Sequence, residues 1–196
     1  MKPQLAAAAL CAALLAAPAV ARDDRPMTAD EVLDLARGQA LWCENYSEET
    51  RDCEGLYMLR QEADGTLVSS AMFLLTEQPR LTFMIAEVVE LRGDQLCSSG
   101  SIDDLNIRAS LEGEPAPETM NLAIRQIFAE SMAPYADKTM CQRLLATDDP
   151  AVLNEEITAD GERLPDFETT YRLGDFDSGF LLRPMVEPEA EGQVAL

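Results

Sequence analysis

The chain has 196 residues, of which 36 are acidic and 15 are basic, so its formal net charge is −21. This charge argues against partners such as nucleic acid and anionic membrane surfaces, because both would repel it. The net negative charge is consistent with high solubility, or with a cationic or envelope protein as partner. The chain has no histidine, which removes the most common general base and zinc ligand.

Residues 1–21 have the pattern of a secretory signal peptide. Lys2 precedes an apolar run over 5–17, and the small residues Ala19 and Ala21 precede the expected cleavage point. The run is shorter than the roughly 20 apolar residues that span a bilayer. We therefore predict cleavage after Ala21, no transmembrane segment after cleavage, and export to the periplasm or the extracellular medium.

The first element expected after the signal peptide is a helix. Thr28 and Glu31 have capping-box spacing, and the apolar positions that follow fit one helical face to about Trp42. Short apolar runs between turn residues then predict antiparallel strands. These cover about 56–62, 66–75, 81–92 and 95–99, with a fifth over 103–111.

The second half of the chain predicts two more helices. One begins at Pro117 and ends near Pro134, and a shorter one covers 136–146. Two further strands are expected, over 167–173 and 179–182, followed by a disordered acidic tail over 184–196. The prediction is one α+β domain over 22–183: an antiparallel β-meander of four or more strands with an N-terminal helix and two later helices packed on it.

Four cysteines remain after cleavage: Cys43, Cys53, Cys97 and Cys141. They allow three connectivities, and export favours disulfides over free thiols. We expect Cys43–Cys53 and Cys97–Cys141. A zinc site made of all four would need closely spaced pairs, which are absent.

Catalytic candidates are few. Ser98, Ser99 and Ser101 follow Cys97, and Lys138, the only lysine after the cleavage site, precedes Cys141. A Cys97–Cys141 bond would bring them near one another, and a desolvated lysine can activate a serine. The alternative interpretation is a polar loop beside a solvated lysine.

Binding candidates are also few. Asp175 and Asp177 resemble the start of a calcium loop but lack its later ligands, so a plain acidic turn is the alternative. Trp42 and Tyr46 flank Cys43 and could form an aromatic contact patch, unless Trp42 packs on the sheet instead. No cofactor is predicted.

The scarcity of catalytic residues favours an exported, non-enzymatic acidic domain. It would bind a protein partner or small ligand through a sheet face or the loop between Cys43 and Cys53. The alternative is a hydrolase with a Ser/Lys or paired-carboxylate site, and a third hypothesis is a structural role in the cell envelope.

Overall fold

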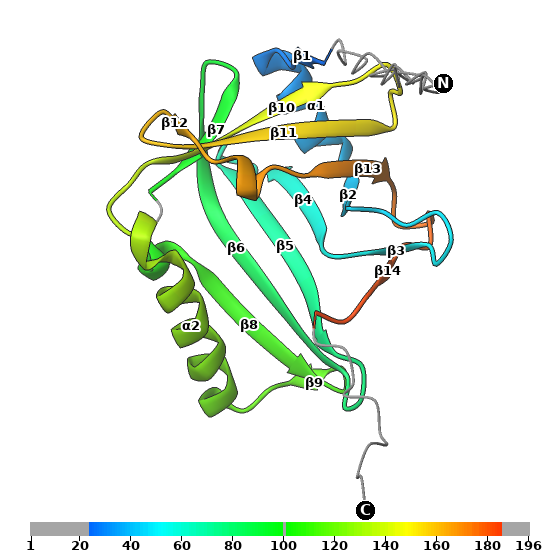
Figure 1. Cartoon of the computed structure of the whole chain (residues 1–196), viewed down its shortest axis with the longest axis vertical. Coiled ribbons are helices and arrows are strands. Elements are labelled where there is room, and N and C mark those ends of the chain that lie inside the picture. The colour runs from blue at the N-terminus through cyan, green and yellow to red at the C-terminus, as the bar shows by residue number, and fades with distance from the viewer. Residues whose placement is uncertain (1–23, 100, 186–196) are drawn as a thin grey trace, which may run out of the picture.

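Eight antiparallel strands close into a barrel in the computed structural model, which describes residues 24–99 and 101–185 (Figure 1). The predicted signal peptide, and residues 186–196 of the predicted tail, lie outside the described residues. The barrel strands are β2 (Leu41–Glu44), β4 (Leu56–Gln61), β5 (Leu67–Thr76), β6 (Leu81–Arg92), β7 (Gln95–Ser98), β10 (Met140–Ala146), β11 (Val152–Ala159) and β13 (Thr170–Gly174). Each pairs with the next in this order, and β13 pairs with β2 to complete the ring.

A second region is inserted between β7 and β10. It contains the 3-10 helix η1 (Ile102–Asp104), β8 (Asn106–Leu111), β9 (Glu114–Pro115), α2 (Glu118–Met132) and η2 (Ala133–Tyr135). Strands β5 and β6 run beyond the barrel, where the first half of β6 pairs with β8 and α2 covers the sheet (Figure 1). Phe83 and Ile124 lie in the hydrophobic core of this region.

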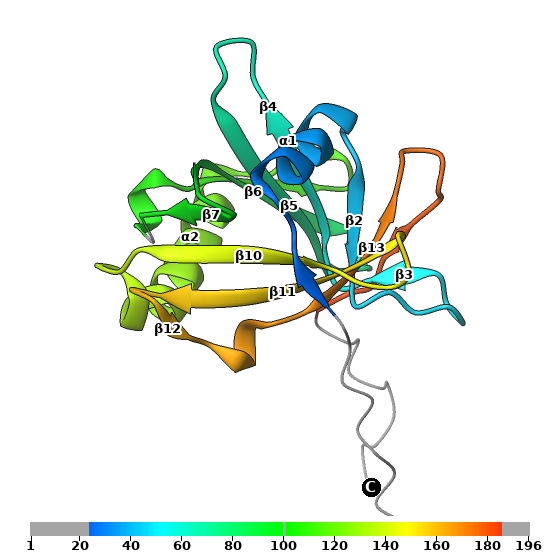
Figure 2. The ribbon, with the colours of Figure 1, turned by 90° about the horizontal axis from the view of Figure 1, so that it is seen from above.

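The N-terminal helix α1 (Ala29–Gly38) closes one end of the barrel. The expected capping box is present, with the Glu31 backbone N–H donating to the Thr28 hydroxyl. Val32 and Ala36 are fully buried against barrel residues, and Figure 2 shows α1 lying over the strands. The remaining elements are β1 (Arg25–Pro26), β3 (Asp52–Cys53), β12 (Glu162–Arg163), η3 (Pro165–Phe167) and β14 (Leu181–Leu182).

The predicted α+β fold is wrong, because the described residues form a mostly β structure with a closed barrel and two α-helices. The clearest local error is the helix expected over 136–146, where the structure has strand β10. Leu144 faces the barrel interior, while Leu145 faces outward and pairs with Pro26 of β1. Because this strand carries apolar residues on both faces, their spacing resembles that of a helix. The residues on one face pack inside the barrel and those on the other face pack outside it.

The barrel interior begins with an apolar layer, which we call the floor. Each of the eight strands contributes one buried side chain to it: Trp42, Leu59, Leu67, Val89, Leu96, Leu144, Leu153 and Tyr171. Because α1 packs on the same cluster, the floor and the helix together close this end.

Two disulfides join Cys43 to Cys53 and Cys97 to Cys141, which is the pairing favoured from the sequence. Cys97 and Cys141 lie directly opposite each other in the β7–β10 ladder, with Cα atoms 4.1 Å apart. Two disulfides fit an exported protein, because disulfides persist in oxidising compartments. No helix in the described part of the chain is long and apolar enough to cross a membrane.

Replacing Cys97 and Cys141 together with Ala should lower the free energy of unfolding by about 4 kcal/mol, because their bond closes a long loop in the unfolded chain. The Cys43–Cys53 bond closes a shorter loop, so the Cys43/Cys53 double variant should lose about 3 kcal/mol. Urea unfolding followed by Trp42 fluorescence measures both. If the Cys97/Cys141 variant lost less free energy of unfolding than the Cys43/Cys53 variant, this would contradict a stabilising role of the disulfide at the β7–β10 junction.

Candidate functional site

A cavity of about 530 Å³ lies beyond the floor, inside the barrel and its open end. Strand side chains alternate between faces, so the residue two positions from each floor residue also points inward. These eight positions all line the cavity, and all are polar: Glu44, Tyr57, Ser69, Glu87, Ser98, Gln142, Glu155 and Thr169. We call this layer the polar ring.

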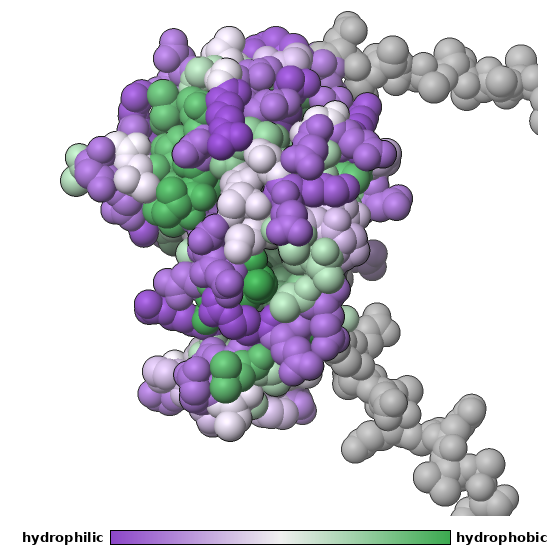
Figure 3. All heavy atoms as spheres, turned by 90° about the vertical axis from the view of Figure 1, so that its left-hand side faces the viewer, coloured by the Kyte–Doolittle hydropathy of each residue, from purple (hydrophilic) through white to green (hydrophobic). Residues whose placement is uncertain are grey.

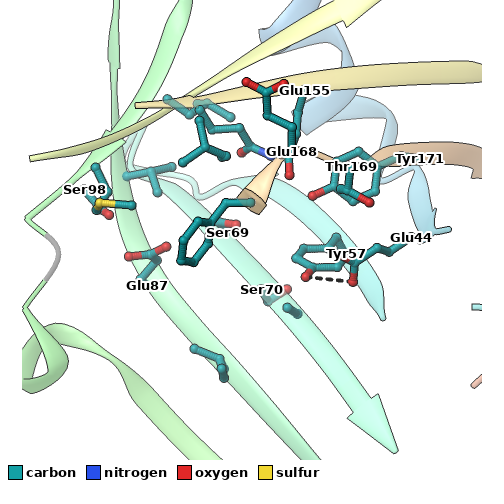
Figure 4. A pocket seen from close by; sticks show the side chains of 18 of the residues that line it. Glu44, Tyr57, Ser69, Ser70, Glu87, Ser98, Glu155, Glu168, Thr169 and Tyr171 are labelled. Carbon is teal, nitrogen blue, oxygen red and sulfur yellow. Dashed lines mark hydrogen bonds between the residues drawn. The ribbon is translucent and has the colours of Figure 1, made fainter. Parts of the chain in front are cut away.

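The polar ring is acidic and lacks a basic member. It includes Glu44, Glu87 and Glu155, which come from different sides of the cavity (Figure 4). Among the described residues, no lysine or arginine lines this cavity. The ring therefore concentrates negative charge in a partly buried space.

Glu155 is the most deeply buried charged side chain of the described residues, at 6% exposed. The neutral amide of Gln142 donates a hydrogen bond to it, and its ionisable neighbours are Tyr171, Glu44 and Glu168. Burial raises the pKa of Glu155 from 4.5 to about 7, against the opposing effect of the Gln142 and Tyr171 contacts. Glu155 therefore titrates near neutral pH.

The other two glutamates of the ring are also held in unfavourable surroundings for a charge. Burial is the main cause that raises the pKa of Glu87, and the Ser98 side chain opposes it. Burial also raises the pKa of Glu44, whose carboxylate accepts a hydrogen bond from the Tyr57 hydroxyl at 3.1 Å. Arg183 is close enough to favour the charge on Glu44, but no cation in the described part of the chain has this effect on Glu87 or Glu155.

The cavity is apolar again above the polar ring, at the end of the barrel opposite α1. The side chains here, which we call the mouth, are Ala71, Phe73, Ile85, Leu105, Phe128, Met132, Met140, Ile157 and Phe167. Phe128 and Met132 come from the last turns of α2, so the inserted region helps to build the mouth. Figure 3 shows hydrophobic patches between hydrophilic residues on the side of the molecule that carries α2.

The structure separates the predicted Ser/Lys candidates. Ser98 belongs to the polar ring, whereas the Ser99 hydroxyl donates to the Asp104 carboxylate and the Ser101 hydroxyl accepts from the Asp103 backbone N–H, both in η1. The Lys138 ammonium lies over the Tyr135 ring, 5.7 Å from its centroid. Among the described residues, no hydrogen bond joins Lys138 to any of these serines.

The predicted binding candidates lie outside the cavity or beneath it. Asp175 accepts hydrogen bonds from the Asp177 backbone and the Ser178 hydroxyl, so its carboxylate stabilises a turn. In the described part of the chain, no group of three His, Cys, Asp or Glu side chains could hold a metal. Trp42 is 3% exposed in the floor, and Tyr46 packs on Phe180, so the two aromatics form no common surface patch.

Sequence reasoning missed most of the polar ring, including Glu44, Glu87 and Glu155. The available signal was a polar residue two positions from a buried apolar one in each strand, but this signal requires the strand ends to be known.

No protein-family model, curated protein or solved structure matches this chain.

The raised pKa of Glu155 predicts a specific pH dependence of stability. Between about pH 4.5 and pH 7 the folded protein retains a proton that the unfolded chain releases, so stability falls as pH rises through this interval. Glu155→Gln removes the charge, and should stabilise the protein at about pH 8 by on the order of 3 kcal/mol.

Urea unfolding of both proteins between about pH 4 and pH 8 measures this difference. It should vanish at the acidic end, where the Glu155 carboxyl is protonated in both the folded and unfolded states. A difference that is absent, or that does not change with pH, would show that Glu155 titrates normally.

Proposed function

We propose that this protein is an exported, non-enzymatic binding protein that holds a small molecule inside its barrel. The observation that carries the proposal is the cavity of about 530 Å³ with its polar ring and apolar mouth. Small-molecule sites are typically concave, about 300–1,000 Å³ in volume, and mostly apolar with a few convergent polar groups. An eight-stranded barrel has an interior wide enough for one small ligand.

The cavity supports this proposal better than the other surfaces considered from the sequence. The loop between Cys43 and Cys53 is a closed turn, in which the Arg51 backbone N–H donates to the Ser47 carbonyl. The cavity, by contrast, presents deeply buried polar groups such as Glu155 to an open space. The Ser/Lys form of the hydrolase alternative has no serine–lysine contact in its favour among the described residues.

Three dansyl probes with the same pentyl chain test the proposal. The pentyl chain of each probe ends in a methyl, an ammonium or a carboxylate group, so the three probes differ only in the group and charge at that end. Dansyl fluorescence rises when the dye enters an apolar site, and we expect at least one probe to bind the wild-type protein saturably.

Cavity-filling variants locate the binding. Ala71 lines the mouth, and Ala71→Phe should weaken binding about tenfold or more by filling the space. Met72 is the next residue in β5, 42% exposed and absent from the cavity wall, so Met72→Phe is the matched control and should bind normally. Binding of no probe, or equal binding by the two variants, would contradict a ligand site in the barrel.

A further inference from the structure

We infer that the ligand is an amphiphilic organic amine, whose ammonium group sits in the space enclosed by the polar ring, which Glu87 and Glu155 line, and whose apolar body fills the mouth. This inference rests on the proposed function and specifies its ligand. It follows from the order of the layers along the barrel axis and from the unbalanced charge of the ring.

Two carboxylates of the ring, Glu87 and Glu155, have no neighbouring cation among the described residues. Glu155 is 94% buried, and it accepts a hydrogen bond from the neutral amide of Gln142, with the neutral Tyr171 side chain also beside it. Glu87 faces the same space with Ser98 beside it. Two buried carboxylates without a basic partner are costly, and an ammonium ion would supply both the charge and the hydrogen-bond donors that they lack.

The arrangement suits an organic cation better than a metal ion. A metal needs several ligand atoms converging on one point, and among the described residues no three acidic side chains are placed to do this. An ammonium group needs fewer acceptor atoms than a metal ion. The hydroxyl oxygens of Ser69 and Ser98 are acceptors in addition to the carboxylate oxygens of the glutamates.

Aromatic rings extend the cation site toward the mouth. Tyr57 lies edge-on to Tyr171 at 5.2 Å and to Phe73 at 5.7 Å between ring centroids, so a continuous aromatic wall connects the floor, the ring and the mouth. Such rings attract cations through their faces and also pack against apolar groups. The wall therefore suits a molecule with a charged head and an apolar body.

The apolar mouth determines which end of the molecule enters first. Ile85, Phe128 and Phe167 surround the opening, and the acidic ring lies deeper, next to the closed floor. A ligand with its charge at the deep end and its apolar part at the mouth places both parts in matching surroundings. The reverse orientation would bury the apolar part against the glutamates.

The three dansyl probes also test this inference. The ammonium-ended probe should bind at least about tenfold more tightly than the methyl-ended one, and the carboxylate-ended probe should bind most weakly. Glu87→Gln and Glu155→Gln should each weaken binding of the ammonium-ended probe about tenfold. Both should leave binding of the methyl-ended probe unchanged.

Glu90→Gln is the matched control, because Glu90 lies in β6 near Glu87, is 69% exposed, and contributes the same charge to the protein as a whole. It should not alter binding of any probe. Preference for the methyl- or carboxylate-ended probe, or an effect of Glu90→Gln equal to that of Glu87→Gln, would overturn the amine assignment. If Ala71→Phe still weakened binding in that case, the proposed small-molecule site would stand.

Discussion

The pairing of β7 with β10 is the interaction on which the rest of the structure depends. These strands are separated in the chain by the whole inserted region, yet their register places Cys97 opposite Cys141. Without this pairing, β7 and β10 would each present an unpaired edge, and the interior would be an open groove. With it, the backbone hydrogen bonds form a closed ring that separates an inside from an outside.

The strands between β4 and β8 were predictable from the sequence, whereas β2, β10, β11 and the closure of the barrel were not. The strands β4, β5, β6 and β7 lie close to their predicted ranges, because alternating apolar residues and turn residues such as Gly65 and Gly93 act locally. The return of β13 to β2 depends on hydrogen bonds between backbone groups that are far apart in sequence. Side-chain patterns carry little information about such contacts, so these four strands, β4 to β7, were interpreted as an antiparallel meander rather than as part of a closed ring.

The candidate site was hidden by the same polar residues that define it. In β11, Glu155 interrupts the inward series between Leu153 and Ile157, and in β10 Gln142 does the same before Leu144. A polar residue at an inward position makes a strand resemble a loop or a helix when only hydrophobic periodicity is considered. The ring members also span residues 44 to 169, so no short motif could identify them.

The closure of one barrel end by α1 has a consequence for selectivity. Val32 and Ala36 seal the floor, so a molecule in the barrel is enclosed at one end and reaches solvent at the other. The enclosed end meets fixed side chains on every side, while the opposite end can vary in length or bulk without a clash. The proposed ligand site would therefore recognise one terminus of a molecule rather than the whole molecule, and compounds that share that terminus would bind it alike.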